Sequence, residues 1–240
     1  MNKVRLCLSL IFLLGLASCT TLLNTPKYQF TDGYYTQKVP GQPSRKVYVD
    51  TEEEDIRVYS LKKTGNYYGV DTGMFTLLPP QGEALPQSYP NGIHFHQKSF
   101  DVDFLSILFK YRPPVQGFPN QFTTSLNGAV YLGYRTDVYS LDFTTDPLGC
   151  HSRETNHYGF SFGGFTGVGA TAMNPWVTNE RISIEYDGVV WSKGLAGILG
   201  LNRFTVGLAL GWDHLLDRNK RVWIYQQKPW AGLAFGLNLN

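Results

Sequence analysis

Large apolar side chains occupy every second position in several segments of the C-terminal half of the chain. The positions between them hold mostly Gly, Ala, Ser, Thr and Asn, with few long charged side chains. The apolar set includes Tyr158, Phe160, Phe162, Val206, Leu208 and Leu210. Successive side chains of a β-strand point to opposite sides, so this period of two predicts strands with two different faces.

The composition of the second face indicates which solvent surrounds the strands. A soluble β-barrel shows water a charged face, but only 17% of this chain is charged, against roughly a quarter in typical soluble domains. Small residues suit the crowded inside of a narrow barrel, and large apolar residues suit lipid. We therefore expect the apolar face to point outward into a membrane. In the alternative, a soluble barrel or sandwich, the same side chains line an internal cavity; the residues that distinguish the two are Leu208, Leu210, Leu233 and Leu237.

The predicted fold class is all-β: a small antiparallel transmembrane-type β-barrel over residues 99–240, with about eight strands or up to about ten. The strand candidates are roughly 99–111, 122–135, 136–143, 157–170, 181–192, 194–200, 204–213, 221–226 and 230–240. The tryptophans lie near the ends of these strands, where an aromatic girdle at the membrane surfaces is expected. They are Trp176, Trp191, Trp212, Trp223 and Trp230.

The region before the barrel, residues 27–98, is predicted to be a short β-rich periplasmic module followed by an irregular linker. Residues 46–50 and 56–60 alternate in pattern around an acidic turn at 51–55, which predicts a hairpin. Residues 63–98 are rich in Gly, Pro, Tyr and Asn and predict a long connection.

The first residues have the layout of a secretory signal peptide: a basic start at Lys3 and Arg5, then an apolar run over 6–16. The run ends in Leu-Ala-Ser before Cys19, and this ending resembles the lipobox of bacterial lipoproteins. The resemblance implies that residues 1–18 are a signal peptide, that Cys19 is acylated and that residues 19–26 are a lipidated tether. Only Cys150 then remains, so no intramolecular disulfide is expected.

The charge of the chain excludes some classes of partner. Loss of Lys3 and Arg5 leaves 19 basic side chains against 19 acidic ones, which argues against nucleic acid because phosphate binding needs a concentrated positive field. No later stretch approaches the roughly 20 apolar residues of a transmembrane helix. A mature chain that spans a membrane must therefore do so as a closed barrel.

Several charged residues fall within the predicted strands. Arg135, Glu185 and Asp187 share phase with the small or polar face. Charges at that depth are tolerated when they are paired or hydrated, so we expect an ion-pair network of these three residues in the barrel lumen. An alternative is that Glu185 and Asp187 act as a catalytic acid–base pair.

Other residue groups could carry chemistry but are incomplete. His94 and His96 have the spacing of two metal ligands on one strand face, yet nothing in the sequence completes the site. Asp213 with His214, and Ser192 with Lys193, have the residue types needed for a Ser/His/Asp-type hydrolase site at a barrel rim. The glycines follow strand alternation and form no phosphate-binding loop. We predict no catalytic residue, no metal and no cofactor.

The segment from residue 100 to residue 240 resembles small outer-membrane β-barrel proteins. The sequence GLALGWD and the C-terminal KPWAGLAFGLNLN carry most of this likeness, although the chain ends in Leu239-Asn240 instead of an aromatic residue. With the lipobox, the whole resembles an outer-membrane lipoprotein with a barrel domain.

The resemblance implies a non-enzymatic structural, scaffold or narrow-conduit role in the outer membrane, with the N-terminus on the periplasmic side. It also implies membrane lipid as a partner and an envelope protein contacted through the N-terminal module. The alternative is a lipocalin-like lipoprotein that binds a hydrophobic ligand inside its barrel, and a rim-site enzyme is a further alternative.

Overall fold

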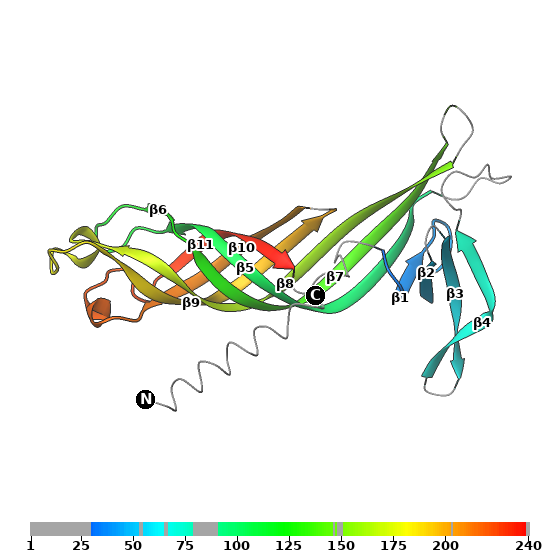
Figure 1. Cartoon of the computed structure of the whole chain (residues 1–240), viewed down its shortest axis with the longest axis horizontal. Helices are drawn as coiled ribbons and strands as arrows, with labels where there is room; N and C mark the ends of the chain where they lie inside the picture. Colours follow the sequence, from blue (N-terminus) through cyan, green and yellow to red (C-terminus); the bar gives the residue numbers. More distant parts are fainter. Residues whose placement is uncertain are drawn as a thin grey trace, which may run out of the picture.

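The computed structural model describes residues 30–52, 55–64, 67–78, 91–145, 147, 151–202 and 204–238. Within these residues the protein is an all-β structure in which every strand pairing is antiparallel (Figure 1). The strands are β1 (Gly33–Lys38), β2 (Arg45–Glu52), β3 (Asp55–Thr64), β4 (Tyr67–Leu78), β5 (Ile93–Arg112), β6 (Gln121–Thr124), β7 (Asn127–Thr145), β8 (His151–Met173), β9 (Tyr186–Leu201), β10 (Phe204–Leu215) and β11 (Pro229–Asn238). Two short 3-10 helices, η1 (Trp176–Thr178) and η2 (Arg218–Arg221), lie in the loops.

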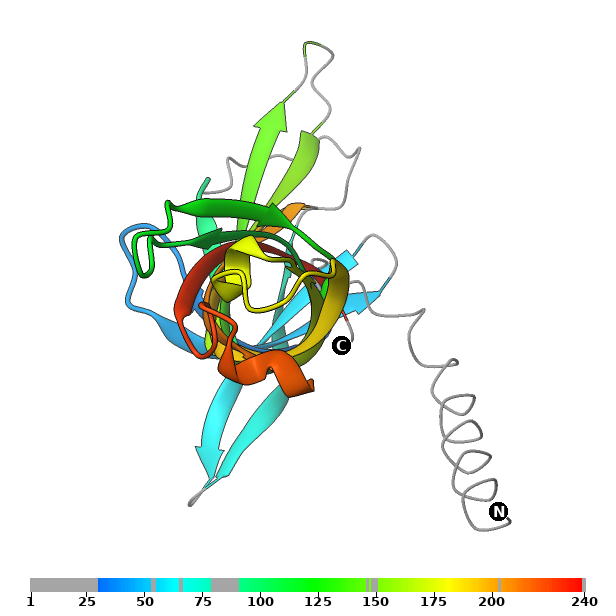
Figure 2. The same ribbon diagram turned by 90° about the vertical axis from the view of Figure 1, so that its left-hand side faces the viewer.

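Six of the strands form a closed ring. The pairing runs from β5 through β7, β8, β9 and β10 to β11, and β11 pairs back with β5. Figure 2 shows this ring end-on. A β-bulge between Leu233 and Ala234 interrupts the closing pair, so that Leu233 lies opposite Phe109 and Ala234 opposite Ile107. The bulge leaves Leu108 as an extra residue on β5.

The ring contains fewer and longer strands than the sequence pattern suggested. The candidate 122–135 begins in β6 and continues in β7, which also contains the candidate 136–143, and the candidates 181–192 and 194–200 belong largely to β9. Extended backbone continues through Arg135-Thr136 and Lys193-Gly194 because no turn residue with a positive φ interrupts it. The candidate 221–226 is not a strand, since it follows η2 as a series of turns.

The remaining strands extend the same sheet away from the ring. β5 and β7 continue past the ring, where β1 pairs with β5 through Thr36 and His96. β2, β3 and β4 then follow in order. The predicted hairpin of 46–50 and 56–60 is confirmed as β2 and β3, in which Val47 lies opposite Ser60. The predicted boundary between residues 98 and 99 falls inside β5.

Three apolar clusters hold the structure together. One lies on the sheet of β1–β5 and β7, and contains Val47, Phe95 and Leu141. A second fills the ring, with Tyr131 and Trp230 as its largest members. The third closes the loop-bearing end of the ring.

No helix among the described residues has both the length and the apolar character needed to cross a bilayer.

Candidate functional site

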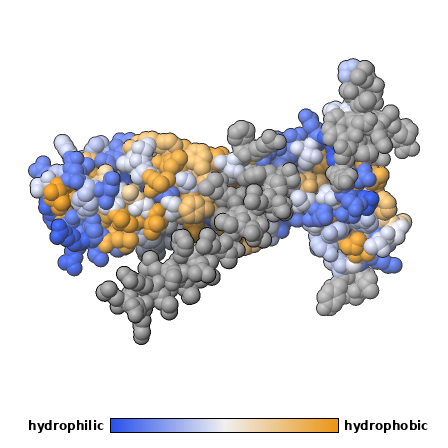
Figure 3. Space-filling model, in the orientation of Figure 1, coloured by the Kyte–Doolittle hydropathy of each residue, from blue (hydrophilic) through white to orange (hydrophobic). Residues whose placement is uncertain are grey.

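The outer surface of the ring is covered by large apolar side chains. The predicted orientation is confirmed: Leu208 is 69% exposed and Phe160 52% exposed, whereas the intervening Ala209 and Ser161 are buried. Figure 3 shows hydrophobic residues gathered on the visible face of this half of the molecule, next to a more hydrophilic tip. Its other exposed members include Phe100, Phe104, Leu108, Val130, Leu132, Tyr134, Phe162, Val168, Leu195, Leu199, Val206, Leu210 and Phe235.

The leucines that distinguish the two sequence interpretations point outward. Leu208, Leu210 and Leu233 are 69%, 62% and 37% exposed. A ligand-binding barrel would require these leucines to line an internal cavity. Their exposure on the outer face shows that they do not. The side chain of Leu237, the fourth residue of that set, lies outside the described side chains.

Aromatic residues mark the two ends of the apolar band. Trp191 and Trp212 lie toward the loop-bearing end, and Tyr134 and Tyr158 lie toward the β1–β4 side, all on the outer face. Lys193 is exposed near the tryptophans, and its Nζ lies 4.8 Å from the centre of the Trp191 ring. A lysine near the edge of an apolar band can extend its ammonium toward water.

The girdle prediction is corrected for two tryptophans. Trp176 is exposed, but Trp223 and Trp230 are only 3% and 1% exposed. Trp230 lies inside the ring, and Trp223 belongs to the apolar cluster at the loop-bearing end. The alternation of β11 points Trp230 inward because it precedes the outward Leu233 by an odd number of positions.

The outward apolar residues extend along most of strand β9. Trp191 and Leu201 are ten residue steps apart on the outer face of β9. At about 3.4 Å per residue, a strand tilted by about 45°, as transmembrane strands are, would span roughly 24 Å along the ring axis over these ten steps. The apolar band of outer-membrane barrels is about 25 Å tall.

The ring interior holds a buried network around Asp213, which accepts hydrogen bonds from four side chains. Lys110 Nζ donates to both carboxylate oxygens, at 3.1 and 3.0 Å, and Arg112 Nη2 donates at 2.5 Å. Ser192 Oγ and Trp230 Nε1 donate to Oδ1 at 2.6 and 2.8 Å. All five residues are at most 2% exposed. The single carboxylate is thus shared by two buried cations.

A second buried network lies toward the β1–β4 side. Arg135 Nε donates to both oxygens of Asp137, at 2.7 and 2.8 Å. His157 Nε2 is 2.6 Å from Asp137 Oδ1. Asp101 and Asp103 are also buried, on the inner face of β5. This end of the interior therefore carries more acidic than basic groups.

The predicted network of Arg135 with Glu185 and Asp187 is corrected by this geometry. Arg135 lies opposite Ser161 of β8, whereas Asp187 lies opposite Ala172, eleven residues further along that strand. At about 3.3 Å per residue, these positions are roughly 36 Å apart. Glu185 and Asp187 are exposed at the loop-bearing end. Alternation in the sequence shows which face of the sheet a side chain occupies, but it does not show where along the ring axis the side chain lies.

Between the two networks the interior is filled by side chains. The Tyr131 side chain lies along the inner wall over Gly133, and its hydroxyl makes a 2.7 Å hydrogen bond with Ser161 of the neighbouring strand β8. Phe165 lies against Trp230, with ring centres 5.9 Å apart. Both Tyr131 and Trp230 are almost completely buried. The two charge networks are thus separated by a packed apolar layer.

The structure does not assemble a serine hydrolase arrangement from Ser192 and His214. Ser192 Oγ donates directly to Asp213 inside the ring. His214 lies on the other face of β10, where its Nδ1 is 2.8 Å from Gln226 Nε2. Because consecutive residues of a strand point to opposite faces, His214 is not placed to take a proton from Ser192.

Among the residues that the structure describes, no three His, Cys, Asp or Glu side chains group as ligands for a metal ion. His94 and His96 lie with ring centres 6.5 Å apart on β5. Burial and the neighbouring His94 and Lys38 lower the pKa of His96. Cys19 and Cys150 lie outside the described residues.

The interior position of Lys110 was not predicted from the sequence. Strict alternation from Leu105 and Ile107 would place Lys110 on the outer face. The extra residue at the bulge shifts the phase by one, so that Lys110 and Arg112 point inward. One signal in the sequence could have indicated the inward position of Lys110: a charged residue directly follows an apolar run.

Comparison with protein-family models, with curated proteins and with solved structures finds no match to this chain.

Proposed function

We propose that this protein is a lipid-anchored outer-membrane protein whose six-stranded ring spans the bilayer as a small, plugged β-barrel. Its role is structural and non-enzymatic: the barrel holds the β1–β4 sheet at one surface of the membrane. The observation that carries the proposal is the outer band of exposed apolar side chains around an interior that buries two charge networks. Contiguous exposed apolar surface of this extent is typical of membrane or partner contact.

The connections of the ring support an orientation. The connection from the end of β9 at Leu201 to the start of β10 at Phe204 is short and lies at the end nearest the β1–β4 sheet. The long connections 113–126, which contains β6, 174–185 and 216–228 lie at the opposite end. In outer-membrane barrels the short turns face the periplasm and the long loops face outward. The β1–β4 sheet then lies in the periplasm, on the side where acylated Cys19 would insert into the inner leaflet.

The packed interior favours a scaffold over a conduit. Tyr131, Phe165 and Trp230 fill the ring between the two charge networks. Even barrels of about eight strands have interiors that side chains can fill, and porins need about 16 strands. Planar-bilayer recordings of the purified protein should show no steady conductance. Large stable openings would contradict the plugged ring.

The β1–β4 sheet offers a surface for an envelope protein partner. Tyr34, Tyr48, Tyr59 and Phe75 form a row across four strands, with ring centres 5.2, 6.5 and 5.6 Å apart. Tyr34 and Phe75 are 58% and 52% exposed. Aromatic residues are enriched at protein interfaces, so this row is where we expect the partner to bind.

The test separates the ring from the lipid anchor. Cys19→Ala is expressed behind a signal peptide that is cleaved without lipidation, and membranes are washed with alkaline carbonate. Membrane spanning predicts that the variant stays in the washed outer-membrane pellet, like the chain with Cys19 intact. Release of the variant into the wash, with the Cys19 form retained, would show that the lipid alone holds the protein and would overturn the proposal.

A further inference from the structure

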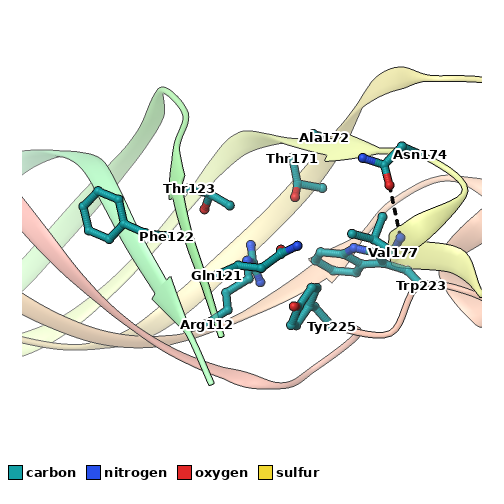
Figure 4. Close-up of a pocket in the computed structure, with 10 residues that line it drawn as sticks. All are labelled: Arg112, Gln121, Phe122, Thr123, Thr171, Ala172, Asn174, Val177, Trp223 and Tyr225. Carbon is teal, nitrogen blue, oxygen red and sulfur yellow. Dashed lines mark hydrogen bonds between the residues drawn. The ribbon is translucent and has the colours of Figure 1, made fainter. Parts of the chain in front are cut away.

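A cavity of about 230 Å³ lies at the loop-bearing end of the ring, apart from the apolar outer band. It is bordered by β6, by the end of β8 and by the turns that follow η2 (Figure 4). The volume is far above the roughly 10–15 Å³ that one water needs on the same measure. The space is therefore large enough for a small organic molecule.

Three side chains at the floor of the cavity each carry a buried donor without a partner in the described part of the chain. Among the residues that the structure describes, Arg112 Nη1, Trp223 Nε1 and Tyr225 Oη have no hydrogen-bond partner. The three side chains are 2%, 3% and 1% exposed, and all three line this cavity. Buried polar atoms without a partner are rare in native proteins. Three of them around one cavity indicate that a ligand supplies the missing acceptors.

The position of the Arg112 guanidinium is fixed by its neighbours. Its Nη2 donates to Asp213 at 2.5 Å. Its central carbon lies 5.2 Å from the ring centres of both Trp223 and Tyr225. The guanidinium is thus held between the interior network and the two aromatic rings, with Nη1 left to bind a ligand oxygen.

The charges of the described residues around the floor do not balance. Lys110 and Arg112 share the single carboxylate of Asp213, which leaves one net positive charge. Burial raises the pKa of the Tyr225 phenol, so the phenol stays protonated and able to donate. One anionic group with two or more oxygens would satisfy the donors and the charge together.

We propose that this cavity binds a small organic monoanion, whose carboxylate accepts hydrogen bonds from Arg112, Trp223 and Tyr225. The side chains of Gln121, Thr123 and Asn174 line the half-buried mouth and contact the body of the ligand. A phosphate dianion fits less well, because its second charge would lie buried without compensation. A sugar acid has suitable chemistry, since its ring packs on aromatic side chains and its hydroxyls pair with the polar mouth.

The test is a calorimetric titration of the folded full chain with sodium D-glucuronate, D-glucose and inorganic phosphate. Glucose provides a neutral body of similar shape, and phosphate provides an anion without that body. We expect glucuronate to bind with a dissociation constant of about 1 mM or below, and glucose and phosphate to bind at least about tenfold more weakly. The titration works in detergent or in buffer, so its result is independent of whether the ring spans a membrane.

The donors are tested with variants that keep the aromatic rings, because replacement of Arg112 would also remove its buried ion pair with Asp213. Tyr225→Phe and Trp223→Phe each remove one donor and retain an aromatic ring, and each should weaken glucuronate binding about tenfold. Tyr139→Phe, at a buried phenol in the β1–β4 half, should leave the affinity unchanged. No heat of binding with glucuronate, equal binding of phosphate, or unchanged affinity in both donor variants would each overturn the proposal.

Discussion

The two halves of strand β7 lie in opposite kinds of surroundings. In the ring, its inner face carries the polar side chains of Asn127, Arg135 and Asp137, and its outer face carries Leu132 and Tyr134. Beyond the ring the pattern inverts. The inner face becomes apolar at Tyr139, Leu141 and Phe143, and the other face carries Ser140, Asp142 and Thr144.

Strand β5 shows the same inversion. Its outer face changes from His94, His96 and Lys98 to Phe100 and Phe104. Its inner face changes from Ile93 and Phe95, in the apolar cluster of the β1–β4 half, to Asp101 and Asp103.

The inversion occurs within a few residues on neighbouring strands. Phe100 of β5 lies opposite Tyr134 of β7, which lies opposite Phe162 of β8. Alternation alone shows that a strand has two faces; the chemistry of the faces shows which one meets water. In the proposed function, this level of the sheet is the membrane boundary. Four predictions test the difference between the ring and the β1–β4 half.

The largest effect is expected from removal of the carboxylate that holds the ring interior together. Asp213→Ala leaves Lys110 and Arg112 buried without the partner that they share. Loss of one partner of a buried ion pair costs about 3–5 kcal/mol. We expect the free energy of unfolding to fall by this amount in urea titrations of the protein in lipid vesicles.

Glu52→Ala is the matched control for Asp213→Ala in the β1–β4 half. Glu52 is 66% exposed and pairs with Arg57 at 2.6 Å, and exposed pairs contribute about 0–1 kcal/mol. Equal losses for the two variants would show that the ring interior is as hydrated as the surface, and would remove the difference between the halves.

A second prediction concerns the outer face of the ring. Leu208→Arg places a charge in the middle of the apolar band, where Leu208 is 69% exposed. An arginine facing lipid near the bilayer midplane costs about 2–4 kcal/mol. Thr144→Arg, on the exposed outer face of β7 beyond the ring, should change the stability by about 0.5 kcal/mol or less. A stable Leu208→Arg protein that leaves the membrane fraction would show that the band faces water.

The orientation of the strand faces could be predicted from the sequence, because alternation is local. The outward position of Phe160 and Leu208 followed directly from it. The pairing of Lys110 with Asp213 could not be predicted, since the residues are 103 positions apart. Their contact depends on closure of the ring and on a bulge in β5, and no pattern in the sequence predicts this bulge.

The predicted number of strands in the ring, about eight, was too high for a different reason. Residues such as Arg135 and Lys193 look like interruptions of an apolar pattern, but the backbone remains extended through them. Arg135 is tolerated because it points inward to Asp137, and Lys193 because it lies near the edge of the band beside Trp191. The cavity at Arg112 could not be predicted either. Trp223 and Tyr225 line it from a loop, where no hydrophobic periodicity indicates the direction of a side chain.

A third, smaller effect is expected from the inner wall of the ring. A Cβ at Gly163 would meet the carbonyl oxygen of Leu132 and the Cα of Gly133 on the paired strand. Overpacking of this kind costs about 1–3 kcal/mol, so Gly163→Ala should lower the free energy of unfolding by that amount. Gly197→Ala is the control, since a Cβ there meets no atom within 4 Å. A loss at Gly197 as large as that at Gly163 would contradict the close packing of the β7–β8 wall.

The smallest effect is a pH dependence in the β1–β4 half, at Asp32. The carboxylate accepts hydrogen bonds from Thr51 Oγ1 at 2.5 Å and from the Thr51 backbone N–H at 2.7 Å, and these bonds lower the pKa of Asp32. A carboxyl group whose pKa is lowered by folding contributes stability that is fully present above its unfolded pKa of about 3.9. This stability is lost as the pH falls through the lowered value.

Asp32→Asn should therefore remove part of the acid-induced loss of stability below about pH 4, measured as a smaller shift of the thermal midpoint between neutral and acid pH. Thr51→Val keeps the backbone donor and loses the hydroxyl, so its acid shift should lie between those of the wild type and Asp32→Asn. Because the side chain of Asp32 lies at the surface, the change should be the smallest of the four. An acid shift that is identical in all three proteins would show that acid acts on the ring or on other carboxylates, and that the Asp32–Thr51 contact does not couple the stability of the β1–β4 half to pH.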